Sequence, residues 1–437
     1  MKLFDEFSPQ SIEEWKSKVE HELKGLSFTN KLIQKDEIEG LSYSKYANKP
    51  SADSARVNYT RAARSRNNDW QIGKRIEVKD EKIANKMALE ALEQGATSLT
   101  FVLQKKAILW SALFENIELD FIESQFETLD ADQVKRLTLA FPEFSIKPLI
   151  FLNDPIGSNT EIYVPQPHQA GQVFFKVNAY GVHQCGGNAT EEIAFALSMG
   201  HEYIHRLMES GFSIDEASAM IRFYFGIGAK YFVETTKFRV FRKLWANVIE
   251  AYSPKENFSY ACYIYAQTGF VNKSVKDPYT NLLRQTTEAM SAVLGGVNEL
   301  IVRSYDEFAQ TKESQLSNRM ALNISNILKE ESYMDKVIDP LGGSFSIEDL
   351  TIKMEENAWK LFQRVENIGS FTTSDKNETL IKSVVETAKK RIEAFHSSER
   401  ILIGVNKYPN PGEKENHWLE LPQYLGLEAL ILEKHLA

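Results

Sequence analysis

The spacing of apolar residues changes along the chain. Between Ser11 and Gly25 the apolar residues Trp15, Val19 and Leu23 recur at intervals of four, which predicts an amphipathic helix with a serine cap and a glycine stop. Residues 32–66 are polar and irregular, and they predict an extended arm that could clasp a partner subunit. From about residue 84 short apolar segments alternate with long helical patterns, which is typical of βα units around a parallel sheet.

Eight segments have the composition of strands in such a sheet. In chain order they are residues 98–103, 116–122, 147–154, 173–181, 220–228, 260–269, 299–306 and 337–344. Long helices are predicted at residues 190–210, 229–252 and 278–294. Eight parallel strands favour a closed (β/α)8 TIM barrel, because the side chains of eight strands just fill a closed interior.

The predicted organisation has three parts. Residues 1–69 form an N-terminal helix and an extended arm for subunit contact, and residues 70–400 form the barrel. Residues 401–437 are richer in proline and glycine at first, and they predict a linker remnant that ends in a short apolar helix.

Composition narrows the function classes. The net charge of −9 has the wrong sign for a protein that wraps nucleic acid or lies on anionic lipid. Two cysteines in 437 residues fit a reducing compartment, so the expected location is the cytoplasm. The first fifteen residues lack the pattern of a secretory signal and no run of 18 apolar residues occurs, so neither export nor membrane insertion is expected.

Polar residues at the carboxyl ends of the strands are the candidates for a barrel site. They are Asn153, Asp154, His183, Gln267, Thr268, Ser304 and Asp339. His183 precedes a glycine-rich turn and a helix, where it could donate a proton or a hydrogen bond to a thioester carbonyl, or simply be satisfied by its neighbours. Gln267 can orient a carbonyl but cannot act as an acid or base, and it could equally be a lining residue.

Two further patterns are read as surface features. His201, Glu202 and His205 fit the zinc peptidase pattern H-E-x-x-H, but they lie within a long helix without a recognisable third ligand. We expect a chance match on a solvated helix face, and no metal. The basic cluster Lys237, Arg239, Arg242 and Lys243 could meet phosphates, although a solvated face is favoured. No phosphate-binding loop, dinucleotide fingerprint or nucleophile elbow occurs.

Four long motifs resemble the barrel of adenosylcobalamin-dependent acyl-CoA mutases, the methylmalonyl-CoA mutase family. They are YGVHQCGGNATEEIAFALSMGHEYI, IRFYFGIGAKYFVETTKFRVFRKLWANVI, YAQTGFVNKSVKDPYTNLLRQTTEAMSAVLGGVNEL and VIDPLGGSFSIEDLT. The resemblance runs from about Trp70 to Lys407. It implies a TIM barrel that holds acyl-CoA along its axis. The family's C-terminal cobalamin-binding domain, with its D-x-H-x-x-G motif, is expected to be absent here.

The departures from the family pattern bear on chemistry. Arg75 stands where the family has a substrate-positioning tyrosine, and Tyr265 replaces a family histidine, whereas His183 and Gln267 are retained. Residues 165–168 only faintly echo the segment that carries the substrate-carboxylate arginine, and no arginine follows them. The resemblance therefore implies no catalytic residues and no cofactor bound by this chain alone, with His183 and Gln267 as retained or vestigial pocket positions.

This pattern resembles the small, non-catalytic subunits of heterodimeric members of the family. Such a chain would assemble with and stabilise a large catalytic subunit that carries adenosylcobalamin and interconverts (R)-methylmalonyl-CoA and succinyl-CoA. The alternative is the acyl-CoA-binding half of a split mutase whose cobalamin domain is a separate chain. In that alternative His183 and Gln267 would be working residues.

Overall fold

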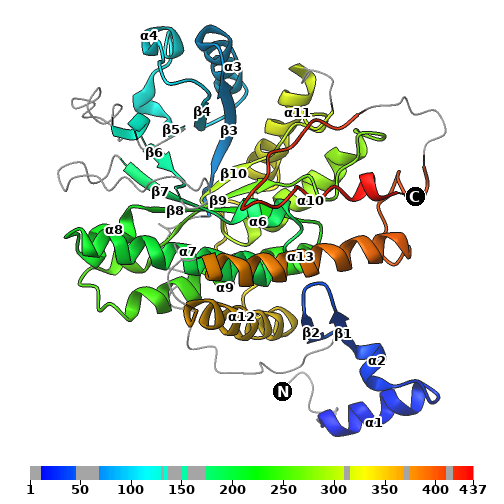
Figure 1. Cartoon of the computed structure of the whole chain (residues 1–437). Helices are drawn as coiled ribbons and strands as arrows, with labels where there is room; N and C mark the ends of the chain where they lie inside the picture. Colours follow the sequence, from blue (N-terminus) through cyan, green and yellow to red (C-terminus); the bar gives the residue numbers. More distant parts are fainter. Residues whose placement is uncertain are drawn as a thin grey trace, which may run out of the picture.

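A computed structural model gives the fold of the chain (Figure 1). It describes residues 11–45, 68–128, 132–135, 150–155, 173–309, 315–368, 374–409 and 417–436. All structural statements below concern these residues. Within them, no helix is long and apolar enough to cross a membrane.

Eight parallel strands close into a barrel, which confirms the predicted (β/α)8 fold (Figure 1). Around the barrel each strand pairs with the next in the chain, and β10 closes the ring against β3. The strands are β3 (Gln71–Val78), β4 (Ser98–Leu103), β5 (Glu123–Glu127), β6 (Ile150–Asn153), β7 (Val173–Asn178), β8 (Ile221–Ile227), β9 (Tyr263–Thr268) and β10 (Glu299–Ile301).

The predicted strand list contained two errors and omitted two strands, β3 and β5. The apolar run of β3 is interrupted by Lys74, Arg75 and Glu77. The strand predicted at 116–122 is wrong, because the chain there makes a short 3-10 turn and β5 begins only at residue 123. Residues 337–344 form no strand, since Asp339 and Gly343 have φ angles of 49° and 86°, which turn the chain toward the following helix.

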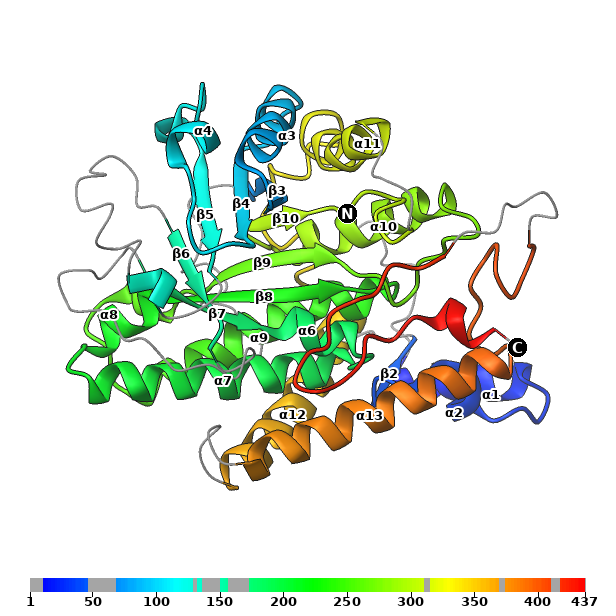
Figure 2. The same cartoon turned by 45° about the horizontal axis from the view of Figure 1, so that its top comes forward.

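Helices of different lengths surround the barrel. In chain order they are α3 (Glu81–Glu93), α4 (Trp110–Leu113), α6 (Ala179–Gln184), α7 (Ala189–Glu209), α8 (Ile214–Ala219), α9 (Tyr231–Glu250), α10 (Thr280–Leu294), α11 (Gln315–Asn326), α12 (Phe345–Glu366) and α13 (Ser374–His396). Helices α7, α9 and α10 confirm the three long helices predicted from the sequence, with small shifts of their ends. Helices α12 and α13 form an additional layer: α12 packs across α7 and α9, and α13 lies along α7 (Figures 1 and 2). This second layer buries helix faces that would otherwise be solvated.

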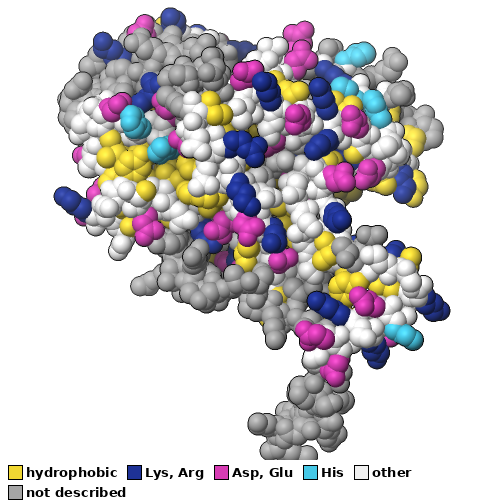
Figure 3. Space-filling view, turned by 60° about the horizontal axis from the view of Figure 1, so that its bottom comes forward, with side chains coloured by type: hydrophobic (Ala, Val, Ile, Leu, Met, Phe, Trp, Pro, Cys, Tyr) yellow, Lys and Arg dark blue, Asp and Glu magenta, His cyan; other side chains and the backbone are white. Residues whose placement is uncertain are grey.

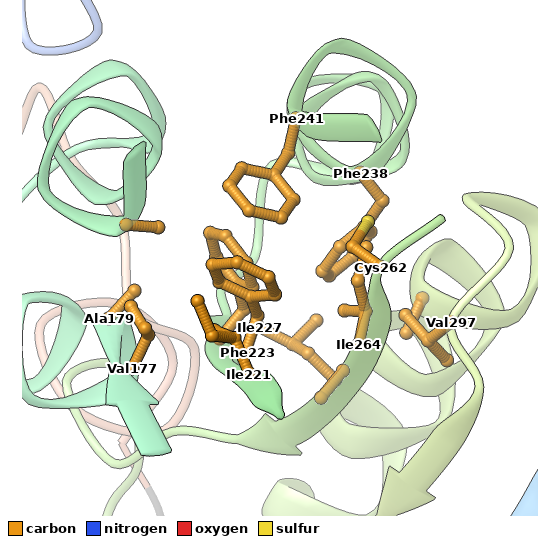
Figure 4. Packing of buried hydrophobic residues seen from close by; sticks show 14 of the residues in the cluster. Val177, Ala179, Ile221, Phe223, Ile227, Phe238, Phe241, Cys262, Ile264 and Val297 are labelled. Atoms are coloured by element: carbon orange, nitrogen blue, oxygen red, sulfur yellow. The ribbon is translucent and has the colours of Figure 1, made fainter. Parts of the chain in front are cut away.

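Part of the main hydrophobic core lies between β8, β9 and α9 (Figure 4). The ring centroid of Phe223 on β8 is 4.7 Å from the centroids of both Phe241 and Trp245 on α9. Each of these side chains is fully buried, and burial of a large apolar side chain contributes roughly 1.5–3 kcal/mol. The core therefore fixes α9 against the two strands that carry the site described below.

The N-terminal segment consists of α1 (Ile12–Glu22), α2 (Phe28–Leu32) and a hairpin of β1 (Ile33–Asp36) and β2 (Leu41–Ser44). Ser11 caps α1 through a reciprocal capping box with Glu14, which confirms the predicted helix start. The hairpin docks on its own barrel, because Asn357 donates to the Gly40 carbonyl and the Ser44 amide donates to Asp349. Helices α1 and α2 stand away from the barrel as an N-terminal lobe (Figures 1 and 3).

The first part of the predicted arm is thus a hairpin on its own barrel rather than an extended segment. Residues 46–67 lie outside the described residues, so a clasp formed by them remains a prediction.

The C-terminal residues 417–436 do not form the predicted apolar helix, apart from a 3-10 turn at Leu432–His435. Positive φ angles at Leu425 and Gly426 break any helix there. The segment instead crosses the barrel loops, where the Leu430 amide donates to the Gln184 carbonyl and the Leu432 amide donates to the Val271 carbonyl. Its apolar residues are buried against those loops, which the spacing along the sequence could not indicate.

Candidate functional site

The inward-facing residues of the barrel fill its axis with aromatic and ionic side chains. At the amino end of the strands, Tyr263 and Tyr265 each donate a hydrogen bond of 3.1 Å to Glu123. Tyr265 stacks on Tyr224, with ring centroids 4.4 Å apart and an angle of 7° between the planes. The Tyr224 hydroxyl in turn donates to Gln125 at 2.8 Å. This layer spans the barrel from β5 to β9.

A second carboxyl lies in the same layer. Glu299 accepts hydrogen bonds from Ser98 at 2.9 Å and from Gln125 at 2.8 Å through one oxygen, while its other oxygen has no partner among the described residues. Burial, together with the nearby Glu123 carboxylate, raises the pKa of Glu299 well above its ordinary value. This carboxyl therefore holds its proton to a higher pH than a free glutamate.

The middle of the axis is an ionic layer. Glu127 lies between Arg75 at 3.1 Å and Lys176 at 2.8 Å. Burial opposes ionisation of Glu127, but Lys176 and Arg75 outweigh it and lower its pKa to about 2. Arg75, which the resemblance aligns with a tyrosine of the family, therefore forms an ion pair with a carboxylate inside the barrel.

Arg303 closes the carboxyl end of the axis. Its Nε donates to the Tyr180 hydroxyl at 3.0 Å, and it forms an ion pair with Glu307. With the Gln267 amide oxygen turned toward it, Arg303 also donates to Gln267 at 2.8 and 3.0 Å. Gln267 is thus brought to the barrel mouth as predicted, and there it binds a side chain of its own chain.

His183 lies on α6 at the carboxyl end of β7, with its ring over two glycines of β8 and the loop after β9. A Cβ atom at Gly226 would lie 2.1 Å from the His183 ring, and one at Gly269 would lie 2.8 Å from Nε2. Real Cβ atoms do not approach other atoms so closely, so these glycines make the space for the ring. The position at the barrel mouth agrees with the prediction.

His183 belongs to a buried network that the sequence analysis missed. Its Nδ1 lies 2.9 Å from Glu192, and Lys237 donates to Glu192 at 3.0 Å and to Glu234 at 2.5 Å. Burial and the Lys237 charge lower the pKa of His183 to about 3, so the ring is neutral at pH 7, and its Nδ1 shares a hydrogen bond with Glu192. Burial raises the pKa of Glu192 to about 7 against the pull of Lys237.

The network resembles a metal site without needing a metal. Donor atoms of His183, Glu192 and Glu234 lie within 4.8 Å of one another, the single such group in the part of the chain that the structure describes. The Lys237 ammonium lies between the two carboxylates and supplies the positive charge that a cation would bring. The donor set is therefore neutralised by the chain itself.

The basic cluster on α9 is a wrong prediction. Lys237, Arg239 and Arg242 are buried rather than solvated. Lys237 points to Glu192 of α7 and Arg242 to the Cys262 carbonyl before β9, whereas Arg239 is covered by α12. Arg239 forms an ion pair of 2.9 Å with Asp339, which lies in the turn before α12 and not at a strand end. No signal within the α9 sequence could reveal this, since the covering helix follows about 100 residues later.

The H-E-x-x-H residues have separate partners. The two ring nitrogens of His201 lie 2.8 Å from Glu366 and 2.7 Å from Tyr252. Glu202 accepts from Arg206 at 2.7 Å, and His205 is exposed beside Glu209. The three side chains do not converge on one point, and the expectation that they bind no metal remains a prediction.

The remaining predicted residues are dispersed. Thr268 accepts a hydrogen bond from the Arg303 amide at 2.9 Å, and Ser304 donates to Asn318 at 2.7 Å. The side chain of Asn153 and residues 165–168 lie outside the described part of the structure.

Comparison with known proteins agrees with the barrel and its motifs. The family model described as methylmalonyl-CoA mutase matches residues 169–425. The methylmalonyl-CoA mutase small subunit of Porphyromonas gingivalis is 32% identical over 97% of this chain and 73% of its own length. The methylmalonyl-CoA mutase of Rhizobium meliloti is 33% identical, over 57% of this chain and 37% of its own length.

Among solved structures, the dihydropteroate synthase of Xanthomonas albilineans covers 60% of this chain and 92% of its own, with 12% identity and a TM-score of 0.31. A likeness this distant supports no conclusion.

The fold and these matches define a barrel protein of the acyl-CoA mutase class. The chain belongs to the methylmalonyl-CoA mutase family, which confirms the resemblance drawn from its motifs. Within that family, its similarity to a small subunit extends over nearly the whole chain, whereas the chain spans only about a third of the Rhizobium meliloti relative.

Proposed function

We propose that this chain is the non-catalytic subunit of a heterodimeric, adenosylcobalamin-dependent methylmalonyl-CoA mutase. Its role is to assemble with and stabilise a large catalytic subunit in the cytoplasm. The holoenzyme interconverts (R)-methylmalonyl-CoA and succinyl-CoA, and the large subunit carries the cofactor. The observation that supports this proposal best is the filled barrel axis.

The side chains on the barrel axis oppose an acyl-CoA through their volume and their charge. The family resemblance implies an acyl-CoA that lies along the barrel axis, and a thioester arm needs an open path between small side chains. Here Tyr224, Tyr265 and Phe174 occupy that path, and all three are buried. Lys176, which pairs with Glu127, lies 4.4 Å from the centroid of the Tyr224 ring, so displacing Tyr224 would also disturb the ionic layer.

The retained residues support the same proposal. A hydrogen bond from His183 to a thioester needs a free ring nitrogen aimed at the axis, but its Nδ1 is already hydrogen-bonded to Glu192. Gln267 is bound to Arg303 across the barrel mouth. Both residues therefore stabilise the barrel instead of facing an open substrate channel.

We expect this chain to bind no corrinoid by itself. The loops after α6 and β9, where a cofactor would meet the barrel mouth, are covered by this chain's own residues 430–432. Adenosylcobalamin in the holoenzyme is accordingly assigned to the partner.

The N-terminal lobe is the candidate contact with that partner. Trp15 of α1 packs edge-on against Phe28 of α2 at 5.9 Å, and Leu26 between them is 56% exposed. The lobe stands away from the barrel, so a partner could bury it without disturbing the core (Figure 3).

Co-purification with the large subunit encoded in the same genome tests the proposal. We expect a stable one-to-one complex, and methylmalonyl-CoA turnover by the large subunit that declines faster on incubation without this chain. A variant that lacks residues 11–32 should fold as a barrel but lose the complex, and Lys86→Ala, an exposed change on α3, should keep it.

Two results would contradict the proposal. One is turnover by this chain alone when it is supplied with adenosylcobalamin and thioester. The other is micromolar binding of methylmalonyl-CoA that His183→Ala abolishes, which would favour the split-mutase alternative.

A further inference from the structure

A small polar pocket lies beside the His183 network, where the hairpin turn, the loop after β8 and the end of α13 meet. Its lining includes Glu39, Lys230, Glu234, Asn272, Arg391 and Arg400. Of the charged side chains in this lining, three are cationic and two are anionic. These residues come from four distant parts of the sequence, so only the fold assembles the pocket.

Both carboxylates of the pocket already have cationic partners. Glu39 lies 3.3 Å from Arg391 and 3.3 Å from Lys230, and it also accepts from the Ala189 amide at 3.1 Å. Burial opposes its ionisation, but Arg391 and Lys230 prevail and lower the pKa of Glu39 to about 2. Glu234 is bound to Lys237.

Arg391 is also satisfied. Its guanidinium donates to the carbonyl oxygens of Gly186 at 2.9 Å and Gly187 at 3.1 Å, in addition to its pairing with Glu39. Its Nε and Nη2 therefore have acceptors within the chain.

Arg400 is the exception. Its Nη1 is buried and has no hydrogen-bond partner among the described residues. Burial and the repulsion from Arg391 lower the pKa of Arg400 to about 10, and the attraction of Glu39 does not compensate. A buried guanidinium nitrogen that has no acceptor and is repelled by a second guanidinium is costly, and an anion between the two would remove the cost.

We propose that this pocket binds an oxyanion, a phosphate or a carboxylate group, whose leading oxygen pairs with Arg400. The space has room for about one water-sized atom, so it accepts one oxygen of the anion and leaves the rest of the ligand toward the surface. Lys230 and Arg391 add long-range attraction. The inference is independent of the proposed subunit role, because it depends on neither a partner chain nor the barrel axis.

Binding of inorganic phosphate and of succinate to the purified chain tests the site, with sodium chloride added to equal ionic strength. We expect a saturable rise in the thermal midpoint with at least one of the two anions, and a dissociation constant measurable by calorimetry. Arg400→Gln should weaken that binding at least tenfold. Lys390→Ala removes an exposed cation of α13 near the pocket and serves as the matched control, with unchanged affinity.

The stability of the variant separates a ligand role from a structural one. In chloride alone, Arg400→Gln should unfold at the same or a higher urea concentration than the parent, since it removes a cation whose Nη1 is buried without an acceptor among the described residues. Arg400→Lys keeps the charge, so it should retain part of the binding. Response to phosphate alone, to succinate alone or to both supports the site and identifies its anion.

Absence of any saturable response in the parent chain would overturn the proposal. An anion affinity that is unchanged in Arg400→Gln would also overturn it. So would a loss of unfolding free energy in chloride, caused by Arg400→Gln, that is larger than the loss of binding free energy.

Discussion

The buried pair of Lys273 and Glu288 provides the sharpest test of the electrostatics of this barrel. Neither side chain has any exposed area. The Lys273 ammonium donates to the two Glu288 oxygens at 2.7 and 2.8 Å and to the Asn272 side chain at 2.9 Å. Asn272 also donates to Glu288 at 2.8 Å. The pair joins the loop after β9 to α10.

Lys273→Met keeps the approximate shape of the side chain but leaves the Glu288 carboxylate with a single remaining donor, Asn272. Removal of one partner from a buried pair costs about 3–5 kcal/mol. Burial raises the pKa of Glu288 already in the parent chain, and removing Lys273 takes away the charge that opposes this. The penalty of the substitution should therefore be smaller at pH 5, where Glu288 is more easily protonated, than at pH 8.

Urea unfolding followed by circular dichroism, on Lys273→Met, Glu288→Gln and the double variant, measures this effect. The double variant should be more stable than the sum of the single effects predicts, with a coupling free energy above about 2 kcal/mol. Lys86→Met, at a side chain that is 78% exposed, should change stability by less than about 0.5 kcal/mol. Additive single effects, or a penalty that does not depend on pH, would refute the reasoning.

Three further predictions concern the axis and the His183 network. Glu299 has a raised pKa in the folded state, so the free energy of unfolding of the parent chain should fall as the pH rises from about 4.5 toward that pKa. In urea titrations, the free energy of unfolding of Glu299→Gln should fall less over the same pH range. Gly226→Ala places a Cβ 2.1 Å from the His183 ring, so we expect the free energy of unfolding, measured by thermal denaturation, to fall by about 1–3 kcal/mol. Adding His183→Ala to the same chain should restore part of that loss. Tyr265→Phe removes one donor to Glu123 and keeps the ring stack, so it should cost about 1 kcal/mol by the same assay, and a neutral result would contradict the assigned hydrogen bond.

Local patterns determined the elements that contain their own signals. Helix α1 begins at the capping box that Ser11 and Glu14 form within four residues. Strands β4 and β8 and the long helices follow from periodicity and from polar ends, both of which are readable over short windows. Eight strands, and with them the closed barrel, were predicted, although two of the predicted strands were wrong and β3 and β5 were missed.

The candidate site was predicted only in part. His183 and Gln267 were found because strand ends and family motifs mark the barrel mouth. Glu192, the partner of His183, lies on helix α7, and Arg303, the partner of Gln267, follows strand β10. The directions of these two side chains depend on packing. The neutral state of His183 follows from burial beside Lys237, which no local pattern encodes.

The amino-acid sequence by itself determined the fold class, the periodic helices and strands, and the family. Tertiary structure alone decided which charges are buried and what they meet: α12 supplies the partners of Arg239, the strands bring Glu127 between Arg75 and Lys176, and distant segments meet around Arg400. The reason is physical. Periodicity is a property of neighbouring residues, whereas burial and electrostatic pairing depend on segments that are far apart in the chain and meet only after folding.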